Sequence, residues 1–316
     1  MKRKLAIFCC LAALAQERQF RTGIRVVQVP VTVTNESGGH VDGLKPGDFQ
    51  VLDNGEPRQV TLDTFGRGFA PISLAIAVQT SGLSKPAVAK IRRIGSLIVP
   101  LVIGRRGEAA ILTFDDEIQW RQDFTSDTAS IQKAIRAIQT GESKQGHMLD
   151  TVVDVASAMK ERKGRRVLLL ISESRDRGSK AKLEDAVQAV EREGVEVFAA
   201  TYSAQATTWT AQPEDLPPPS GANYLAVFTE MARLGKTNHA SALTQATGGA
   251  QYPFLRERTI EKAIETLGVD VHAQYILSFP EPADAAGMHE IAVSMPNRTD
   301  LHIRARRAYC AESGVP

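Results

Sequence analysis

A buried-strand pattern that runs directly into a polar turn places the strongest constraint on how this chain can fold. Residues 73–78 read Ser-Leu-Ala-Ile-Ala-Val, and residues 79–84 read Gln-Thr-Ser-Gly-Leu-Ser. An apolar run of this length, bounded by Pro71 and Gly82, is typical of a central strand in a parallel sheet. Ligands of open α/β sheets lie at the carboxyl ends of such strands, so any site is expected at residues 79–84.

Strand and helix patterns alternate across residues 69–272. Further buried strands are predicted at residues 109–114, 166–171, 195–200 and 252–255, and an antiparallel edge strand at 118–120. Apolar residues at helical spacing predict helices at residues 85–101, 128–138, 148–161, 181–193, 224–233, 240–247 and 259–271. Repeated units of this length imply right-handed crossovers. We therefore expect an α/β fold with a Rossmann-like, doubly wound, mainly parallel sheet and helices on both faces.

The segment before this domain, residues 20–67, has a β pattern. Apolar residues recur at every second position, as in a half-buried strand, at Val27, Val29, Val31 and Val33. Pro30 argues that this strand lies at a sheet edge, because proline cannot donate a ladder hydrogen bond. Asp53-Asn54-Gly55 predicts a tight turn between short strands at residues 51–52 and 60–62.

The segment after the α/β domain, residues 274–310, is also β. Its strands are predicted at residues 275–279, 289–295 and 301–306. Each flank is too small to close a core alone, so we expect the two to pair into one small β-sandwich-like domain, into which the α/β domain is inserted. Residues 203–222 are too rich in proline for a packed element and predict an insertion within the α/β domain.

Residues 1–15 have the pattern of a signal peptide. A basic start, Met1-Lys2-Arg3-Lys4, precedes a short apolar core, and Ala13-Leu14-Ala15 offers the small residues that a signal peptidase requires. Cleavage after Ala15 would export the protein to the periplasm or outside the cell, with no integral membrane segment left. The alternative, a retained anchor, is less consistent with an apolar core about half the length that spans a bilayer. After cleavage Cys310 would be the only thiol, which leaves no internal disulfide.

Charge and motif content exclude several classes of function. The chain has 38 Lys plus Arg against 36 Asp plus Glu, so no strong field would attract nucleic acid or an anionic membrane. The six histidines are scattered without zinc-binding spacing, and neither a G-x-S-x-G motif nor a dinucleotide fingerprint is present. We therefore expect a protein that is not an enzyme and has no nucleic-acid partner.

Short motifs in both flanks accompany the α/β pattern. They lie at residues 29–34, 43–49, 53–57, 274–277 and 304–309. Together with the pattern over residues 69–271, they resemble the exported bacterial proteins related to the von Willebrand factor type A (VWA) domain. The resemblance implies an exported adhesion module that binds a protein partner through the loops at the carboxyl ends of the sheet strands.

In this family those loops generally hold a metal-ion-dependent adhesion site, built from an Asp-x-Ser-x-Ser motif and a later Thr and Asp. Its hard oxygen ligands bind Mg²⁺ and leave one position for a carboxylate of the partner. Here Gln79 stands at the motif's Asp position, Ser81 at the first Ser and Leu83 at the second. His147 or a neighbour replaces the Thr, and Ser172-Glu173-Ser174 replaces the later Asp.

Of the family's ligands only Ser81 matches in kind. Without the motif's Asp, the set lacks the negative charge that offsets the dehydration of Mg²⁺. We therefore expect a degenerate site that binds neither a metal nor another cofactor, on a retained scaffold. Residues expected to contact the partner are Gln79, Thr80, Ser81, Ser84, His147 and Glu173.

Two alternatives stay open. A rearranged site would make this a divalent-metal-dependent adhesion protein that binds Mg²⁺ or Ca²⁺ through Ser81, Ser84, Glu173 and Asp176. The chain would instead be a cell-envelope enzyme if an unrecognised cleft held a nucleophile, a base and an oxyanion hole together. The acidic cluster Asp115-Asp116-Glu117 reads as a solvated turn, with a divalent-ion contact as its alternative.

Overall fold

The computed structural model describes residues 25–63, 71–81, 90–93, 97–104, 106–202, 238–254, 257–282 and 286–311. The predicted signal peptide, the proline-rich insertion at 203–222 and the helix predicted at 224–233 lie outside these ranges. Part of the helix predicted at 85–101 lies outside them too, and its last turn, η2 (Val99–Ile103), is a π-helix.

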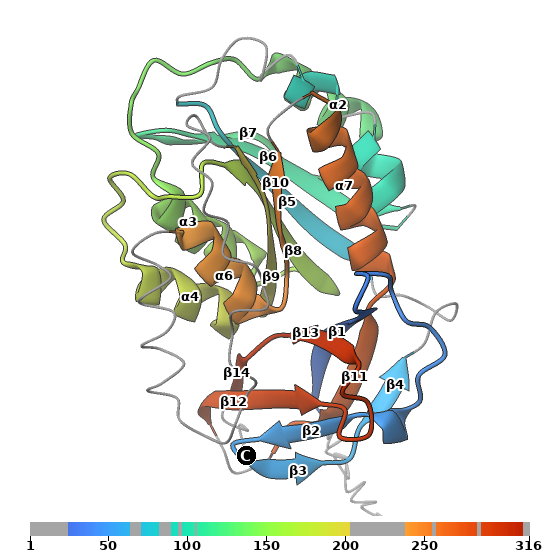
Figure 1. Ribbon diagram of the computed structural model, residues 1–316. Helices are drawn as coiled ribbons and strands as arrows, with labels where there is room; N and C mark the ends of the chain where they lie inside the picture. Colours follow the sequence, from blue (N-terminus) through green and yellow to red (C-terminus); the bar gives the residue numbers. More distant parts are fainter. Residues whose placement is uncertain are drawn as a thin grey trace, which may run out of the picture.

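A six-stranded sheet forms the centre of the α/β domain (Figure 1). In spatial order its strands are β10 (Gln251–Phe254), β9 (Val195–Tyr202), β8 (Arg165–Ser172), β5 (Ile72–Gln79), β6 (Glu108–Phe114) and β7 (Ile118–Thr125). All neighbouring strands are parallel except β6 and β7, as expected for an antiparallel edge. Counted along the chain, this is the doubly wound order 3-2-1-4-5-6, which reverses between β5 and β8.

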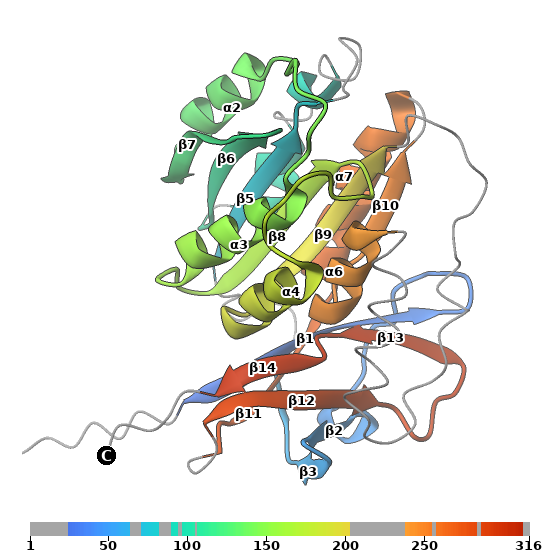
Figure 2. The ribbon, with the colours of Figure 1, turned by 90° about the vertical axis from the view of Figure 1, so that its left-hand side faces the viewer.

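Helices cover both faces of this sheet (Figure 2). On one face lie η2, α2 (Thr128–Ala137) and α7 (Glu257–His272), and on the other α3 (Met148–Met159), α4 (Leu183–Arg192) and α6 (His239–Thr247). Every residue of β5 is buried, because Leu74 and Ile76 face the first layer while Ala75 and Ala77 face the second. The predicted fold class is confirmed, and the apolar run at 73–78 is the central strand.

The two flanks together form a domain of two four-stranded sheets. One has the order β13 (Leu301–Ala305), β1 (Val26–Asn35), β11 (Tyr275–Pro280) and β4 (Thr61–Asp63). The other has the order β14 (Ala308–Ala311), β12 (Gly287–Ser294), β2 (Gln50–Asp53) and β3 (Glu56–Arg58), and a short 3-10 helix, η1 (Pro46–Asp48), precedes β2. Each sheet takes strands from both flanks, and one core between them includes Val31, Leu277 and Ile291. The predicted β-sandwich-like domain is confirmed.

The prediction that Pro30 marks an edge strand is wrong, because β1 lies between β13 and β11. β13 pairs with β1 only from Val31 onward, whereas Pro30 is opposite Ile276 of β11. The strand therefore has a single neighbour at Pro30, which explains why proline is tolerated in an inner strand.

The turn at residues 53–55 forms as predicted, but with another partner strand. Asn54 and Gly55 have φ angles of 49° and 84°, as a two-residue type I′ turn requires, and they join β2 to β3. The predicted partner at 60–62 instead belongs to β4, which pairs with β11 in the other sheet. β14 was not predicted, because four residues without clear alternation give no strand signal.

The β domain packs against the amino ends of the parallel strands. Arg165, the first residue of β8, donates hydrogen bonds to Glu196 near the start of β9 (3.0 Å) and to Gln274. Gln274 in turn donates to Thr32 of β1 at 3.2 Å. All four residues are buried. The β domain therefore occupies the end of the sheet opposite the carboxyl ends of its strands (Figures 1 and 2).

Candidate functional site

The sheet's switch point lies where β5 and β8 end side by side. β5 ends at Gln79 and β8 at Ser172, so the turns beginning at Thr80 and Glu173 meet at this edge. The backbone N–H of Thr80 donates to Phe114 O at the end of β6 (2.9 Å), which joins a third strand end to the same place. This is the position at which open α/β sheets bind their ligands.

The Gln79 side chain bridges the two turns. Its Oε1 accepts the backbone N–H of Glu173 at 2.9 Å, and its Nε2 donates to Ser81 Oγ at 2.9 Å. Gln79 is 1% exposed and Ser81 is fully buried. The amide thus uses one acceptor and one donor to tie neighbouring strand ends together, a combination that a carboxylate in its place would not provide.

A third loop closes over the Gln79 amide at Gly146. The backbone N–H groups of Gly146 and Arg177 each donate to the other residue's carbonyl, at 2.9 and 3.0 Å. A Cβ added at Gly146 would lie only 2.4 Å from Gln79 Nε2. The loop therefore needs glycine for its close approach to the amide, and the space above Gln79 is filled.

Glu173 contributes its carboxylate to an ion pair. Its Oε2 lies 3.0 Å from Nη2 of Arg177, and its side chain is 12% exposed. Tyr202, the last residue of β9, donates its hydroxyl to the backbone oxygens of Ser81 (3.3 Å) and Gln79 (3.5 Å). Burial raises the pKa of the Tyr202 phenol, and the negative charge of Glu173 raises it further, so the hydroxyl remains a donor.

Thr80 and His147 lie at the side of the site nearest β6. Thr80 Oγ1 donates to Asp115 Oδ2 at 3.3 Å, and the backbone N–H of His147 donates to Asp115 O at 2.8 Å. His147 precedes α3, and its Nδ1 lies 3.9 Å from Asp150 Oδ2. The cluster at 115–117 is a turn, as expected, in which the Glu117 backbone N–H donates to Asp115 Oδ1 at 3.2 Å.

Asp176 has its hydrogen bonds elsewhere. Its Oδ1 accepts from the backbone N–H of Leu149 in the first turn of α3 (3.0 Å) and from Ser179 Oγ (2.6 Å). Its own N–H donates to Nδ1 of His239 (3.1 Å), whose pKa is lowered mainly by burial. This carboxylate thus satisfies the start of a helix and its own loop, as a capping residue does.

The structure brings together Gln79, Thr80, Ser81, Glu173 and, at the edge, His147. Asp176 instead engages α3, and Ser84 lies outside the described residues. Sequence reasoning missed three participants, Gly146, Arg177 and Tyr202. Gly146 and Arg177 are next in sequence to the predicted residues His147 and Asp176, and Tyr202 follows a predicted strand of the sheet, so all three fall at the same edge.

The described residues at the switch point, which do not include Leu83 and Ser84, do not fit a metal ion. The Gln79 amide occupies the motif's Asp position, Ser81 Oγ accepts its N–H, and the Glu173 carboxylate is paired with Arg177. Within the described ranges, no three His, Cys, Asp or Glu side chains gather where they could hold a metal. Mg²⁺ requires several oxygen ligands free to coordinate at once, which this hydrogen-bonding pattern does not offer.

None of the helices in the described ranges is long and apolar enough to cross a membrane.

Comparison with known proteins gives structural likenesses only. No family model matches the chain, and no curated protein matches its sequence significantly. The solved structure of the conserved hypothetical protein BatB from Bacteroides thetaiotaomicron is 16% identical, with a TM-score of 0.42 over 62% of this chain and 98% of that one. Proximal thread matrix protein 1 from the mussel byssus, with a zinc-occupied MIDAS motif, is 13% identical, with a TM-score of 0.47 over 65% of this chain and 46% of that one.

A third likeness is to the SpRpn10 VWA domain, 8% identical, with a TM-score of 0.40 over 61% of this chain and 94% of that one. The metal named for the byssus protein is a property of that protein. In this chain the fold rests on its own topology: the doubly wound order, the antiparallel edge strand β7 and the helices on both faces. In fold, the α/β domain of this chain is similar to a VWA domain.

Proposed function

We propose that this chain is an exported, non-enzymatic module that binds a protein partner through the loops at the carboxyl edge of its VWA-like sheet, without a bridging metal. The observation that carries the proposal is the buried Gln79 amide, which ties the turns after β5 and β8 together where a metal would otherwise sit. Recognition would then depend on the shape and side chains of the surrounding loops.

Those loops are held in place by contacts within the fold. The Asp150 carboxylate accepts the backbone N–H groups of Lys180 (3.0 Å) and Ala181 (2.8 Å), and the mutual hydrogen bonds of Gly146 and Arg177 join the loop before α3 to the loop after β8. A surface that is already ordered loses little conformational entropy on binding. This supports a docking surface that needs neither metal nor rearrangement.

The surface itself is polar and carries both signs of charge. Its exposed side chains in the described loops are those of Asp116, Glu117, Glu142, Lys144, Gln145, Arg175, Arg177 and Lys180. Mixed charge of this kind gives specificity and steers encounter more than it adds affinity. The partner's surface is therefore expected to carry charges of both signs.

Site-specific photo-crosslinking tests the proposal with the full chain. A photoreactive amino acid is placed at Asp116 or Lys144 in the loops, and at Lys133 of α2 or Gln188 of α4 as exposed controls. Cell-envelope extract of the source organism is then irradiated with each protein, with and without a chelator. We expect the same single protein to crosslink to both loop positions and to neither control position. The yield should be the same with and without the chelator.

Two outcomes would contradict the proposal. Equal crosslinking from Lys133 and Gln188 would show that the loops are not the binding surface. Loss of the product in the chelator, together with saturable Mg²⁺ or Ca²⁺ binding in calorimetry that Glu173→Ala abolishes, would favour the metal-dependent alternative.

A further inference from the structure

A cleft of about 230 Å³ lies between the two domains, at the end of the molecule opposite the candidate site. The α/β domain contributes the starts of β8 and β9 and the end of α4, and the β domain contributes β1 and the segment around β14. Its volume is many times what a single water needs. Four arginines line it: Arg165, Arg166, Arg192 and Arg306.

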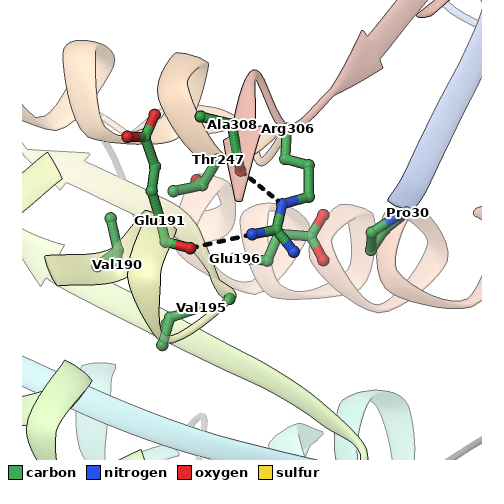
Figure 3. A pocket seen from close by; sticks show the side chains of 9 residues that line it. Pro30, Val190, Glu191, Val195, Glu196, Thr247, Arg306 and Ala308 are labelled. Carbon is green, nitrogen blue, oxygen red and sulfur yellow. Dashed lines mark hydrogen bonds between the residues drawn. The ribbon is translucent and has the colours of Figure 1, made fainter. Parts of the chain in front are cut away.

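Arg166 and Arg306 are fixed by main-chain carbonyls and not by carboxylates. Arg166 donates to Arg162 O through Nε (3.0 Å) and to Glu193 O through Nη1 (2.5 Å). Arg306 donates to Ala308 O through Nε (2.9 Å) and to Glu191 O through Nη2 (3.0 Å), as Figure 3 shows. Each guanidinium is thus oriented by neutral groups and keeps one terminal nitrogen without a partner among the described residues.

The deepest arginine has an unpaired group as well. The Arg165 side chain is 7% exposed, and its two terminal nitrogens bond to Val271 O, Glu196 and Gln274. Its Nε is buried and has no hydrogen-bond partner in the described part of the chain. Buried N–H groups are nearly always satisfied, and Arg165 lines the cavity, so an acceptor held there would provide this group with a partner.

Basic side chains outnumber acidic ones among the residues that line the cleft. Glu193, Glu196 and Glu281 also line it, but Glu196 is already held by Arg165 and Gln274. Burial lowers the pKa of Arg306 to about 10. The negative charges of Glu191 and Glu196 oppose this shift, and the positive charge of Arg166 adds to it. Two like charges held close together and partly desolvated are costly unless an anion joins them.

We propose that the interdomain cleft binds a small oxyanion, the phosphate, sulfate or carboxylate group of a small molecule, through the free nitrogens of Arg166 and Arg306 and the exposed Arg192. Guanidinium groups present planar donors that suit tetrahedral and carboxylate oxygens. The site would bridge the α/β domain and the β domain, so the ligand would also hold the two together. It is independent of the loops proposed to bind a protein.

Isothermal titration of the full chain with inorganic phosphate, sulfate or succinate, at ionic strength held constant with NaCl, tests this site. We expect saturable binding of at least one of the three. The Arg192 side chain is exposed, so Arg192→Gln should weaken the affinity for the ligand roughly threefold. Arg166→Gln should weaken it about tenfold or more. Arg136→Gln on α2, which removes the same charge on another surface, should leave the affinity unchanged.

The three ligands identify the chemistry of the oxyanion. Binding of succinate alone would assign a carboxylate ligand, and binding of phosphate or sulfate alone a tetrahedral one. Absence of saturable binding for all three would overturn the proposal. The proposal would also be overturned if Arg192→Gln and Arg166→Gln bound the ligand as tightly as Arg136→Gln. Circular dichroism checks that each variant is folded.

Discussion

Gln79 determines the chemistry of the carboxyl edge through the two hydrogen bonds of its amide. The donor and acceptor face different partners, Ser81 Oγ and the Glu173 backbone, so neither a carboxylate nor an aliphatic side chain would replace both. The side chain is neutral, which lets it remain 1% exposed without a counter-ion.

Gln79→Ala is expected to lower the free energy of unfolding by about 1–3 kcal/mol, because the buried N–H of Glu173 loses its acceptor. Urea denaturation followed by circular dichroism measures the change. Gln119→Ala, the same truncation at an exposed position of β7, should stay within about 0.5 kcal/mol of the wild type. Equal effects at both positions would mean that the amide bridge does not stabilise the fold.

Gly146→Ala tests whether the loop above the amide needs glycine. Its added Cβ would meet Gln79 Nε2 at 2.4 Å, so the loop or the amide must move, at a cost of about 1–3 kcal/mol. Gly47→Ala is the matched control, since a Cβ there meets nothing within 4 Å. Thermal unfolding should show a lower Tm for Gly146→Ala alone, and a Tm equal to that of Gly47→Ala would contradict the packing.

At the scale of elements, the end of α4 carries a buried carboxyl where it contacts the β domain. Glu191 is 6% exposed, and Arg306 bonds to its main-chain carbonyl. Burial raises the pKa of the Glu191 carboxyl to about 7, against the opposing charges of Arg306 and Arg307. The folded chain therefore binds this proton at a pH where the unfolded chain has released it.

Because the folded-state pKa is the higher one, Glu191 makes the protein less stable as pH rises from about 4.5 to about 7. At about 1.4 kcal/mol per unit, its share of the loss amounts to up to about 3 kcal/mol. Urea unfolding at several pH values should show a smaller decline for Glu191→Gln than for the wild type. Glu184→Gln, an exposed position of the same helix, should follow the wild type; identical profiles for all three would refute the assignment.

Across the whole molecule, the two domains are joined by buried polar groups as well as by the chain. Arg165 links the starts of β8 and β9 to Gln274, and Asp270 near the end of α7 accepts from Arg304 of β13 (2.6 Å) and pairs with His40 (2.9 Å). Removing one partner of such a buried pair leaves the other as an uncompensated buried charge or polar group. The orientation of the β domain on the α/β domain should therefore depend on single residues.

Arg165→Gln leaves Glu196 as a buried charge without its partner, so the free energy of unfolding should fall by about 3–5 kcal/mol. Differential scanning calorimetry measures the loss and shows whether the wild type's transition divides into two as the domains uncouple. Arg298→Gln, which breaks an exposed pair with Asp300, should leave the transition unchanged. A fully wild-type transition in Arg165→Gln would show that apolar packing alone joins the domains.

The sequence alone determined the elements and the class of fold. A continuous apolar run predicted the central strand β5, because a strand covered on both faces has no polar positions. The alternating valines predicted β1, but its place inside a sheet depended on β13, which lies some 270 residues further along the chain. β13 pairs with β1 only from Val31 onward, so Pro30 needs no ladder hydrogen bond on that side. The location of the candidate site followed from sheet geometry. The resemblance to the family showed that Gln79 stands where the family's motif has Asp.

Only the tertiary structure decided what those residues do. The Gln79 amide meets a backbone group 94 residues further along the chain, and the glycine above it belongs to a third loop. Local sequence patterns do not predict such contacts. The contacts form when distant segments pack together and each buried polar group must find a hydrogen-bond partner. The same holds for the arginine cleft, whose charges come from β8, α4 and the segment before β14 and meet only where the two domains join.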